Sequence, residues 1–114
     1  MISLSTHTLD SSNGSHAAGV NVKLLVFKDS NKIFELWSRE TDEGGRLKVE
    51  FAIDNKYHNC DFQLSFDIGS YFPARLKTLQ AKSVSIGINL PDHDGVYHIP
   101  IIISPHGASL WWST

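Results

Sequence analysis

Hydrophobic and polar residues alternate over most of the chain. In "VNVKLLVFK", which begins at Val20, the residues Val20, Val22, Leu24 and Val26 fall on one face. The segment "GRLKVEFAI", which begins at Gly45, alternates in the same way. A period of two places successive side chains on opposite faces of an extended chain. It therefore predicts half-buried β-strands, each with one face in water.

Clusters of turn-forming residues divide this pattern into short segments. Asp, Asn, Ser and Gly concentrate in "DSSNGS", "KDSNK", "TDEGG" and "LPDHDG", and these residue types favour turns. About eight strands are predicted between them, a number and spacing typical of an all-β sandwich or barrel: Ser3–Asp10, Gly19–Lys28, Phe34–Thr41, Gly45–Ile53, Asn59–Phe66, Ala81–Asn89, Gly95–Ser104 and Ala108–Trp112. One short helix is expected within Ser70–Gln80, where better helix formers follow an early proline.

The strand "VYHIPIIIS" differs from its neighbours because both of its faces are mostly apolar. One face carries Tyr97, Ile99, Ile101 and Ile103, and the other carries Val96, His98, Pro100 and Ile102. A strand of this kind needs a cover on each side. Pro100 has no N–H to donate, so the strand must be irregular there or lie at an edge. The second face is therefore a candidate subunit interface or enclosed pocket, with His98 on it.

Composition and charge narrow the class of protein. The 114 residues predict a single domain over 1–114. Ten Lys and Arg against twelve Asp and Glu, scattered along the chain, argue against a nucleic-acid-binding protein. No apolar run approaches the roughly 20 residues that cross a membrane. The first residues lack a signal-peptide pattern, and Cys60 is the only cysteine, which favours the cytoplasm.

Six histidines raise the question of a metal site. Zinc sites favour closely spaced ligand pairs, and the chain has no HxH, HxxxH or CxxC, so no metal is predicted. From the residues alone, His7 and His98 are either structural or functional, and Arg46 is most simply a solvated residue. The remaining histidines lie near turns or sheet ends and are expected on the solvated surface: His16, His58, His93 and His106.

Four segments, in this order, resemble the 5-hydroxyisourate hydrolases, the transthyretin-related proteins. They are "STHTLD", "TDEGGR", "LSFDIGSYF" and "YHIPIIISPHG", and the resemblance extends from Leu4 to Ser109. The last segment is the most specific of the four. The resemblance implies a transthyretin-like sandwich of two four-stranded sheets with one short helix. It also implies a homotetramer, a dimer of dimers, whose central channel is lined by the strands that carry His7, Arg46 and His98.

The same resemblance implies an enzyme of urate degradation that needs neither metal nor organic cofactor. The expected reaction adds water to 5-hydroxyisourate and gives 2-oxo-4-hydroxy-4-carboxy-5-ureidoimidazoline. His7 and His98 are implied to activate water and return a proton, a task that suits a side chain titrating near pH 7. Arg46 is implied to stabilise developing negative charge, and its planar fork matches the edge of an oxidised purine.

The C-terminal tail departs from the family pattern. These hydrolases typically end in Tyr-Arg-Gly-Ser, which folds back into the active site, and an ungapped alignment from "SPHG" places Trp111, Trp112, Ser113 and Thr114 at those four positions. They are the candidate substrate-binding residues. Two hypotheses follow. The chain is a hydrolase whose Trp111 stacks on the flat substrate, or it is a non-catalytic transthyretin-like protein whose tryptophans line a channel for an aromatic small molecule.

Overall fold

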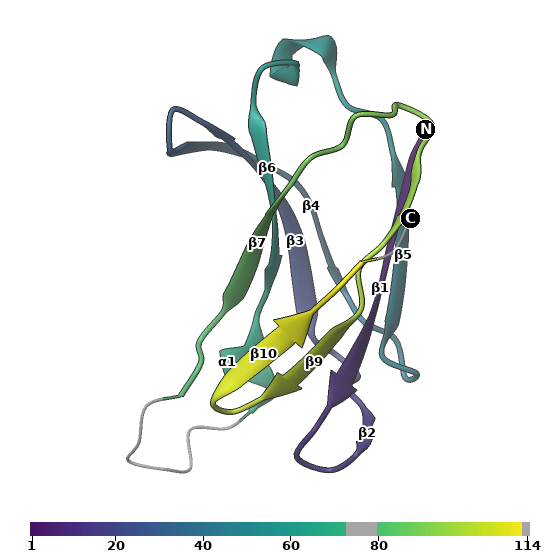
Figure 1. The fold of residues 1–114 in the computed structure, drawn as a ribbon, viewed down its shortest axis with the longest axis vertical. Coiled ribbons are helices and arrows are strands. Elements are labelled where there is room, and N and C mark those ends of the chain that lie inside the picture. The colour runs from purple at the N-terminus through teal and green to yellow at the C-terminus, as the bar shows by residue number, and fades with distance from the viewer. Residues whose placement is uncertain (73–79, 113–114) are drawn as a thin grey trace.

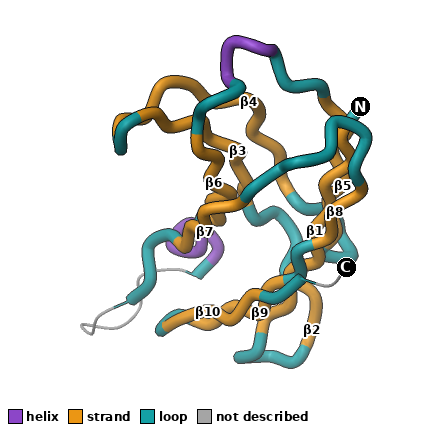
Figure 2. Tube along the Cα trace, turned by 45° about the horizontal axis from the view of Figure 1, so that its top comes forward, coloured by secondary structure: helices purple, strands orange, loops and turns teal. Residues whose placement is uncertain are grey.

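Two β-sheets pack face to face in the computed structural model, which describes residues 1–72 and 80–112 (Figures 1 and 2). The first sheet is antiparallel throughout and has the order β4-β3-β6-β7. Its strands are β3 (Asn21–Lys28), β4 (Asn31–Glu40), β6 (Asp61–Phe66) and β7 (Val84–Ile88).

The second sheet is built around β1 (Ile2–Asp10), which has neighbours along both edges. On one edge β1 pairs antiparallel with β5 (Arg46–Phe51) and the two-residue β2 (Ser15–His16). On the other edge it pairs in parallel with β8 (Val96–His98) and β9 (Ile101–Ser104), and β10 (Gly107–Leu110) pairs with β9. Because β8 and β9 follow the same edge, they form one interrupted strand. The predicted sandwich of two four-stranded sheets is thus confirmed, with β2 as a short addition.

The interruption between β8 and β9 lies at Ile99 and Pro100, where the sequence predicted an irregularity. The Ile99 carbonyl accepts a hydrogen bond from Oγ1 of Thr6 at 2.6 Å, and its N–H donates to the carbonyl of Ser5 at 2.9 Å. The Pro100 carbonyl accepts from the N–H of Trp111 at 3.3 Å. Backbone groups freed by the break therefore find partners, as buried polar groups require.

The core fills the space between the sheets, as the alternating pattern predicted. Val20, Val22, Leu24 and Val26 are fully buried. Every second residue of β1, from Ile2 to Asp10, is also buried, while the residues between them are only partly buried. The remaining face of β1 is therefore turned outward, away from the core.

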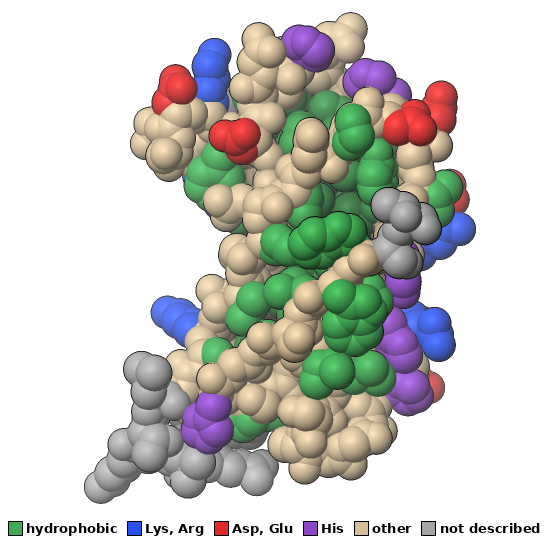
Figure 3. Space-filling model, viewed as in Figure 1, with side chains coloured by type: hydrophobic (Ala, Val, Ile, Leu, Met, Phe, Trp, Pro, Cys, Tyr) green, Lys and Arg blue, Asp and Glu red, His purple; other side chains and the backbone are tan. Residues whose placement is uncertain are grey.

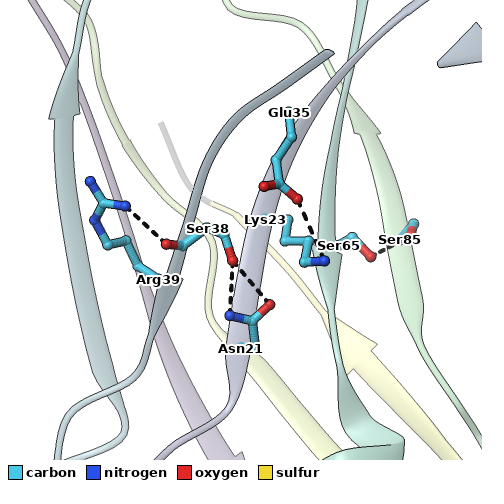
Figure 4. Close-up of polar contacts among 7 residues, drawn as sticks. All are labelled: Asn21, Lys23, Glu35, Ser38, Arg39, Ser65 and Ser85. Carbon is cyan, nitrogen blue, oxygen red and sulfur yellow. Dashed lines mark hydrogen bonds and ion pairs between the residues drawn. The ribbon is translucent and has the colours of Figure 1, made fainter. Parts of the chain in front are cut away.

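The outer face of the first sheet is polar and linked by side-chain contacts (Figure 4). These contacts join Asn21 with Ser38, Lys23 with Glu35, and Ser65 with Ser85. Exposed contacts of this type add little to stability. His7, His16 and His98 belong to the other sheet, the second one.

The helices are short. η1 is a single 3₁₀ turn at Asn55–Tyr57, and α1 spans Ile68–Tyr71. The helix expected within Ser70–Gln80 is described only in part: α1 overlaps it at Ser70 and Tyr71 but begins earlier, where Asp67 accepts a hydrogen bond from the Ser70 N–H, and its capping residue Phe72 is extended. A residue that precedes proline disfavours helical backbone. Residues 73–79 of the predicted helix lie outside the described part. Within the described ranges, no helix has the length and hydropathy that crossing a membrane requires.

Candidate functional site

Strand register brings the three implied catalytic residues onto one face. His7 lies on the outward face of β1 and pairs directly with Arg46 at the start of β5. Two positions earlier, Ser5 pairs with His98 at the end of β8. Side chains at adjacent positions of neighbouring strands lie close together. Residues from three distant parts of the chain therefore converge on the outer face of the second sheet.

The "TDEGGR" segment forms the turn that positions Arg46. One carboxylate oxygen of Asp42 accepts hydrogen bonds from the N–H groups of Gly44 and Arg46, both at 2.9 Å. Gly45 has a positive φ of 72°, and a Cβ there would overlap the carbonyl oxygen of Thr8. Thr8 also donates its N–H to the Gly45 carbonyl at 2.7 Å. The turn is thus fastened to β1, which fixes where β5 and its arginine begin.

His98 has a hydrogen-bonding neighbour on β1. Its Nδ1 lies 2.8 Å from Oγ of Ser5, so one ring nitrogen is held and the ring orientation is restricted. Sequence reasoning did not single out Ser5, because a serine on an outward strand face is ordinary. Only the parallel pairing of β1 with β8 places it beside His98.

His7 contacts His16, a residue that the sequence predicted to lie on the solvated surface. Nε2 of His7 lies 2.9 Å from Nδ1 of His16, and the ring centroids are 5.0 Å apart. His16 is exposed, as expected, but it also belongs to the site. The signal that could have found it is Asn13-Gly14, a dipeptide typical of tight hairpins. This turn folds His16 back against β1, opposite Leu9.

The surroundings of His7 favour its neutral form. Burial lowers the pKa of His7 below its ordinary 6.5, and the positive charge of Arg46 and the neighbouring His16 lower it further. His98 adds a smaller effect in the same direction, while a backbone hydrogen bond at Gly44 opposes them. A neutral imidazole near pH 7 can accept a proton. The site thus combines a base with a fixed cation.

The tail passes close to this face. β10 ends at Leu110, and the two tryptophans that follow are 43% and 64% exposed. Trp112 helps to line a cavity of about 450 Å³ between β7 and β8, together with Ile88, Val96 and His98. Trp111 contacts the break at Pro100 through its backbone. Ser113 and Thr114, the other predicted binding residues, lie outside the described residues.

The cavity and the polar groups are neighbours on the surface. In Figure 3, hydrophobic side chains spread across the middle of the molecule, and histidine side chains gather at its edge beside basic ones. An apolar cavity with a few convergent polar groups is the usual form of a small-molecule site. Because His98 lines the cavity, a flat molecule bound there would lie beside one of the three implied catalytic residues.

Comparison with known proteins agrees with this architecture. The family model described as "Transthyretin: HIUase/Transthyretin family" matches residues 4–112. The chain is 30% identical to the 5-hydroxyisourate hydrolase of Halalkalibacterium halodurans, covering 95% of this chain and 94% of that protein. It is also 30% identical to the 5-hydroxyisourate hydrolase of Caulobacter vibrioides, covering 97% of each.

A solved structure gives the same result at the level of the fold. The 5-hydroxyisourate hydrolase of Klebsiella pneumoniae superimposes with a TM-score of 0.70 and 26% identity, covering 98% of this chain and 99% of that one. Family model, sequence relatives and fold thus coincide over nearly the whole chain. The chain belongs to the HIUase/Transthyretin family.

Proposed function

We propose that this protein hydrolyses 5-hydroxyisourate to 2-oxo-4-hydroxy-4-carboxy-5-ureidoimidazoline in urate degradation. The observation that carries the proposal is the convergence of His7, Arg46 and His98 on one sheet face. The relatives bearing the hydrolase name support it, since they match along nearly their full length.

In the proposed reaction His7 is the base. It removes one proton from a water molecule as the water oxygen attacks a ring carbonyl of the substrate. The lowered pKa of His7 supports this role, because the neutral ring is available near pH 7. The carbonyl oxygen gains negative charge during the attack, and Arg46, paired with His7 across the strands, offers a fixed positive charge for it.

The second half of the reaction requires a proton donor. The ring C–N bond breaks, the carbonyl is restored as part of a carboxylic acid that releases its proton to solvent, and the departing nitrogen takes up a proton. We assign this donation to His98, whose ring is held by Ser5. The proton taken by His7 and the one given by His98 then exchange with solvent, so the protein returns to its starting state.

Assembly and the tail complete the proposal. Val96, 81% exposed on the outer face of β8, and the exposed tryptophans support a face that is covered by other copies. A homotetramer built on this face would enclose the site in a channel and exclude bulk water. Trp111 and Trp112 would then close over the flat substrate, in place of the family's Tyr and Arg. The cytoplasmic location expected from the sequence stays a prediction.

The cavity itself supports a second candidate function, the binding of a small molecule. Its apolar lining and Trp112 suit an aromatic small molecule with no reaction taking place. In that case the chain would be a non-catalytic transthyretin-like binding protein. The same experiment separates the two functions.

The test follows the ultraviolet absorbance of 5-hydroxyisourate generated in place from urate by urate oxidase. Micromolar native protein should accelerate the decay, and His98→Ala should slow the enzyme by about 10²-fold or more, the usual contribution of general acid–base catalysis. His58→Ala, which removes an exposed histidine outside the site, is the matched control and should retain the native rate.

Two results would count against the hydrolase. Native protein that leaves the decay unchanged would exclude catalysis and favour the binding protein. A His98→Ala variant with the native rate would remove His98 from the mechanism. Quenching of tryptophan fluorescence by the ligand, measured in the native protein and in Trp112→Ala, then tests binding alone.

A further inference from the structure

The contact between His7 and His16 is not used by the mechanism above. Two ring nitrogens lie 2.9 Å apart, a distance that requires one hydrogen between them. One ring therefore donates and the other accepts, so the contact exists only when at least one nitrogen of this pair carries a lone pair. His16 is brought there by the pairing of β2 with β1, and not by a flexible loop.

The contact depends on how many protons the two rings carry. If both rings were fully protonated, both facing nitrogens would be donors, the hydrogen bond would be lost, and two positive charges would be in contact. The pair is therefore stable with one added proton at most.

We propose that His16 is a positioning residue that orients the ring of His7 through the contact between the two ring nitrogens. This inference rests on the proposed function, because the residue that His16 positions, His7, is the base of that reaction. His16 does not have to touch the substrate. It acts through Nε2 of His7: the contact fixes the ring plane and leaves Nδ1, the other ring nitrogen, to accept the proton from water.

Two other groups around His7 also lower its pKa: Arg46 on β5 and His98 on β8. The backbone at Gly44, in the turn before β5, has the opposite effect. Arg46 is permanently charged, so its effect does not change between pH 5 and 8. Any change in the titration of His7 on replacement of His16 is therefore separable from the contribution of Arg46.

Two substitutions of His16 separate its effect on the orientation of the His7 ring from the effect of its charge. His16→Asn keeps a polar group near the position of Nδ1 but cannot carry a charge, whereas His16→Ala removes both. His16 is exposed, so both variants should fold. His58→Ala is the matched control. Each protein is titrated by NMR at the ring proton of His7, and kcat/KM for 5-hydroxyisourate is measured against pH.

Both His16 variants should raise the titration midpoint of His7, because a like-charged neighbour is gone, and should move the acid limb of kcat/KM to higher pH. Above that limb, His16→Ala should lower kcat/KM by about threefold to tenfold, the factor that one neutral hydrogen bond supplies. His16→Asn should recover most of this loss. The control should match the native protein in both measurements.

Failure of this inference differs from failure of the proposed function. Native protein without hydrolase activity overturns the proposed function, whatever the titration gives. An active native protein whose His16→Ala variant keeps the native acid limb and the native midpoint of His7 overturns only the role of His16. Equal loss of activity in both variants with an unchanged midpoint would also overturn it, since that pattern marks a purely structural effect.

Discussion

At the scale of single residues, Gly45 shows how one position controls the site. It needs a positive φ, and it also lies where any side chain would meet the carbonyl oxygen of Thr8. Both restrictions hold the turn that starts β5 opposite His7. Gly45 takes no part in the proposed reaction, but the turn that it allows sets where β5 and its first residue, Arg46, begin.

Gly45→Ala should destabilise the protein more than Gly14→Ala. Gly14 has a nearly equal φ of 71° but open space around a built Cβ, so it isolates the conformational part, about 1 to 3 kcal/mol. Gly45 adds the overlap with backbone that cannot move away easily. Urea unfolding of the two variants measures the difference. Equal free energies of unfolding would mean that the turn shifts freely and does not fix Arg46.

The site residues could be predicted only in part from the sequence. His7, Arg46 and His98 stood out because their segments resemble a known family. His16 did not stand out, since its role depends on a two-residue strand. Ser5 was missed because its partner lies 93 positions away, and nothing local encodes that pairing.

At the scale of elements, β1 is the strand on which the second sheet depends. Along its buried face, Thr6 donates its hydroxyl to the Ile99 carbonyl at 2.6 Å. Thr8, equally buried on the same face, has a hydroxyl oxygen with no hydrogen-bond partner among the described residues. The two buried threonines therefore differ in whether the hydroxyl is hydrogen-bonded, which allows a matched comparison.

Thr6→Val should lower the free energy of unfolding by about 1 to 3 kcal/mol, because it leaves a buried carbonyl at the strand break without its partner. Thr8→Val should be neutral or stabilising, since valine has nearly the same shape and removes an unpaired hydroxyl. Thermal or urea unfolding of both variants checks the contrast. A Thr8→Val variant that loses as much stability as Thr6→Val would contradict it.

The sequence predicted the strands better than it predicted their ends. The alternating pattern located the strands and the core because burial imposes a period of two. It joined β8 and β9 into one strand, although the proline signalled a break. It placed the short helix within Ser70–Gln80, whereas α1 begins at Ile68, directly after its capping residue Asp67.

At the scale of the whole molecule, the two outer faces have different surfaces. One is polar, with charged and hydroxyl side chains in contact with each other. The other carries the site and the exposed Val96 and Trp112. Exposed apolar groups beside a cavity are typical of a surface that meets a partner. This difference supports assembly through the face that bears the histidines.

Val96→Asp should dissociate the proposed tetramer, because a carboxylate buried without a partner at an interface is strongly unfavourable. Val96→Leu keeps the apolar character and is the control. Sedimentation velocity should give the native protein and the control about four times the 12.7 kDa mass of the chain, and Val96→Asp a smaller species. A native protein that sediments as a monomer would rule out the channel.

The parallel pairing of β1 with β8 and β9 has a consequence for how the chain acquires its shape. During synthesis, β1 finds these neighbours only after some 90 further residues have been made, as the separation of 93 positions between Thr6 and Ile99 shows. Contacts between such distant segments are slow to form. Until then one edge of β1 is unpaired and open to misassembly with another nascent chain. Slow refolding is therefore expected of this domain, and the face that bears His7, Arg46 and His98 should be among the last parts to form.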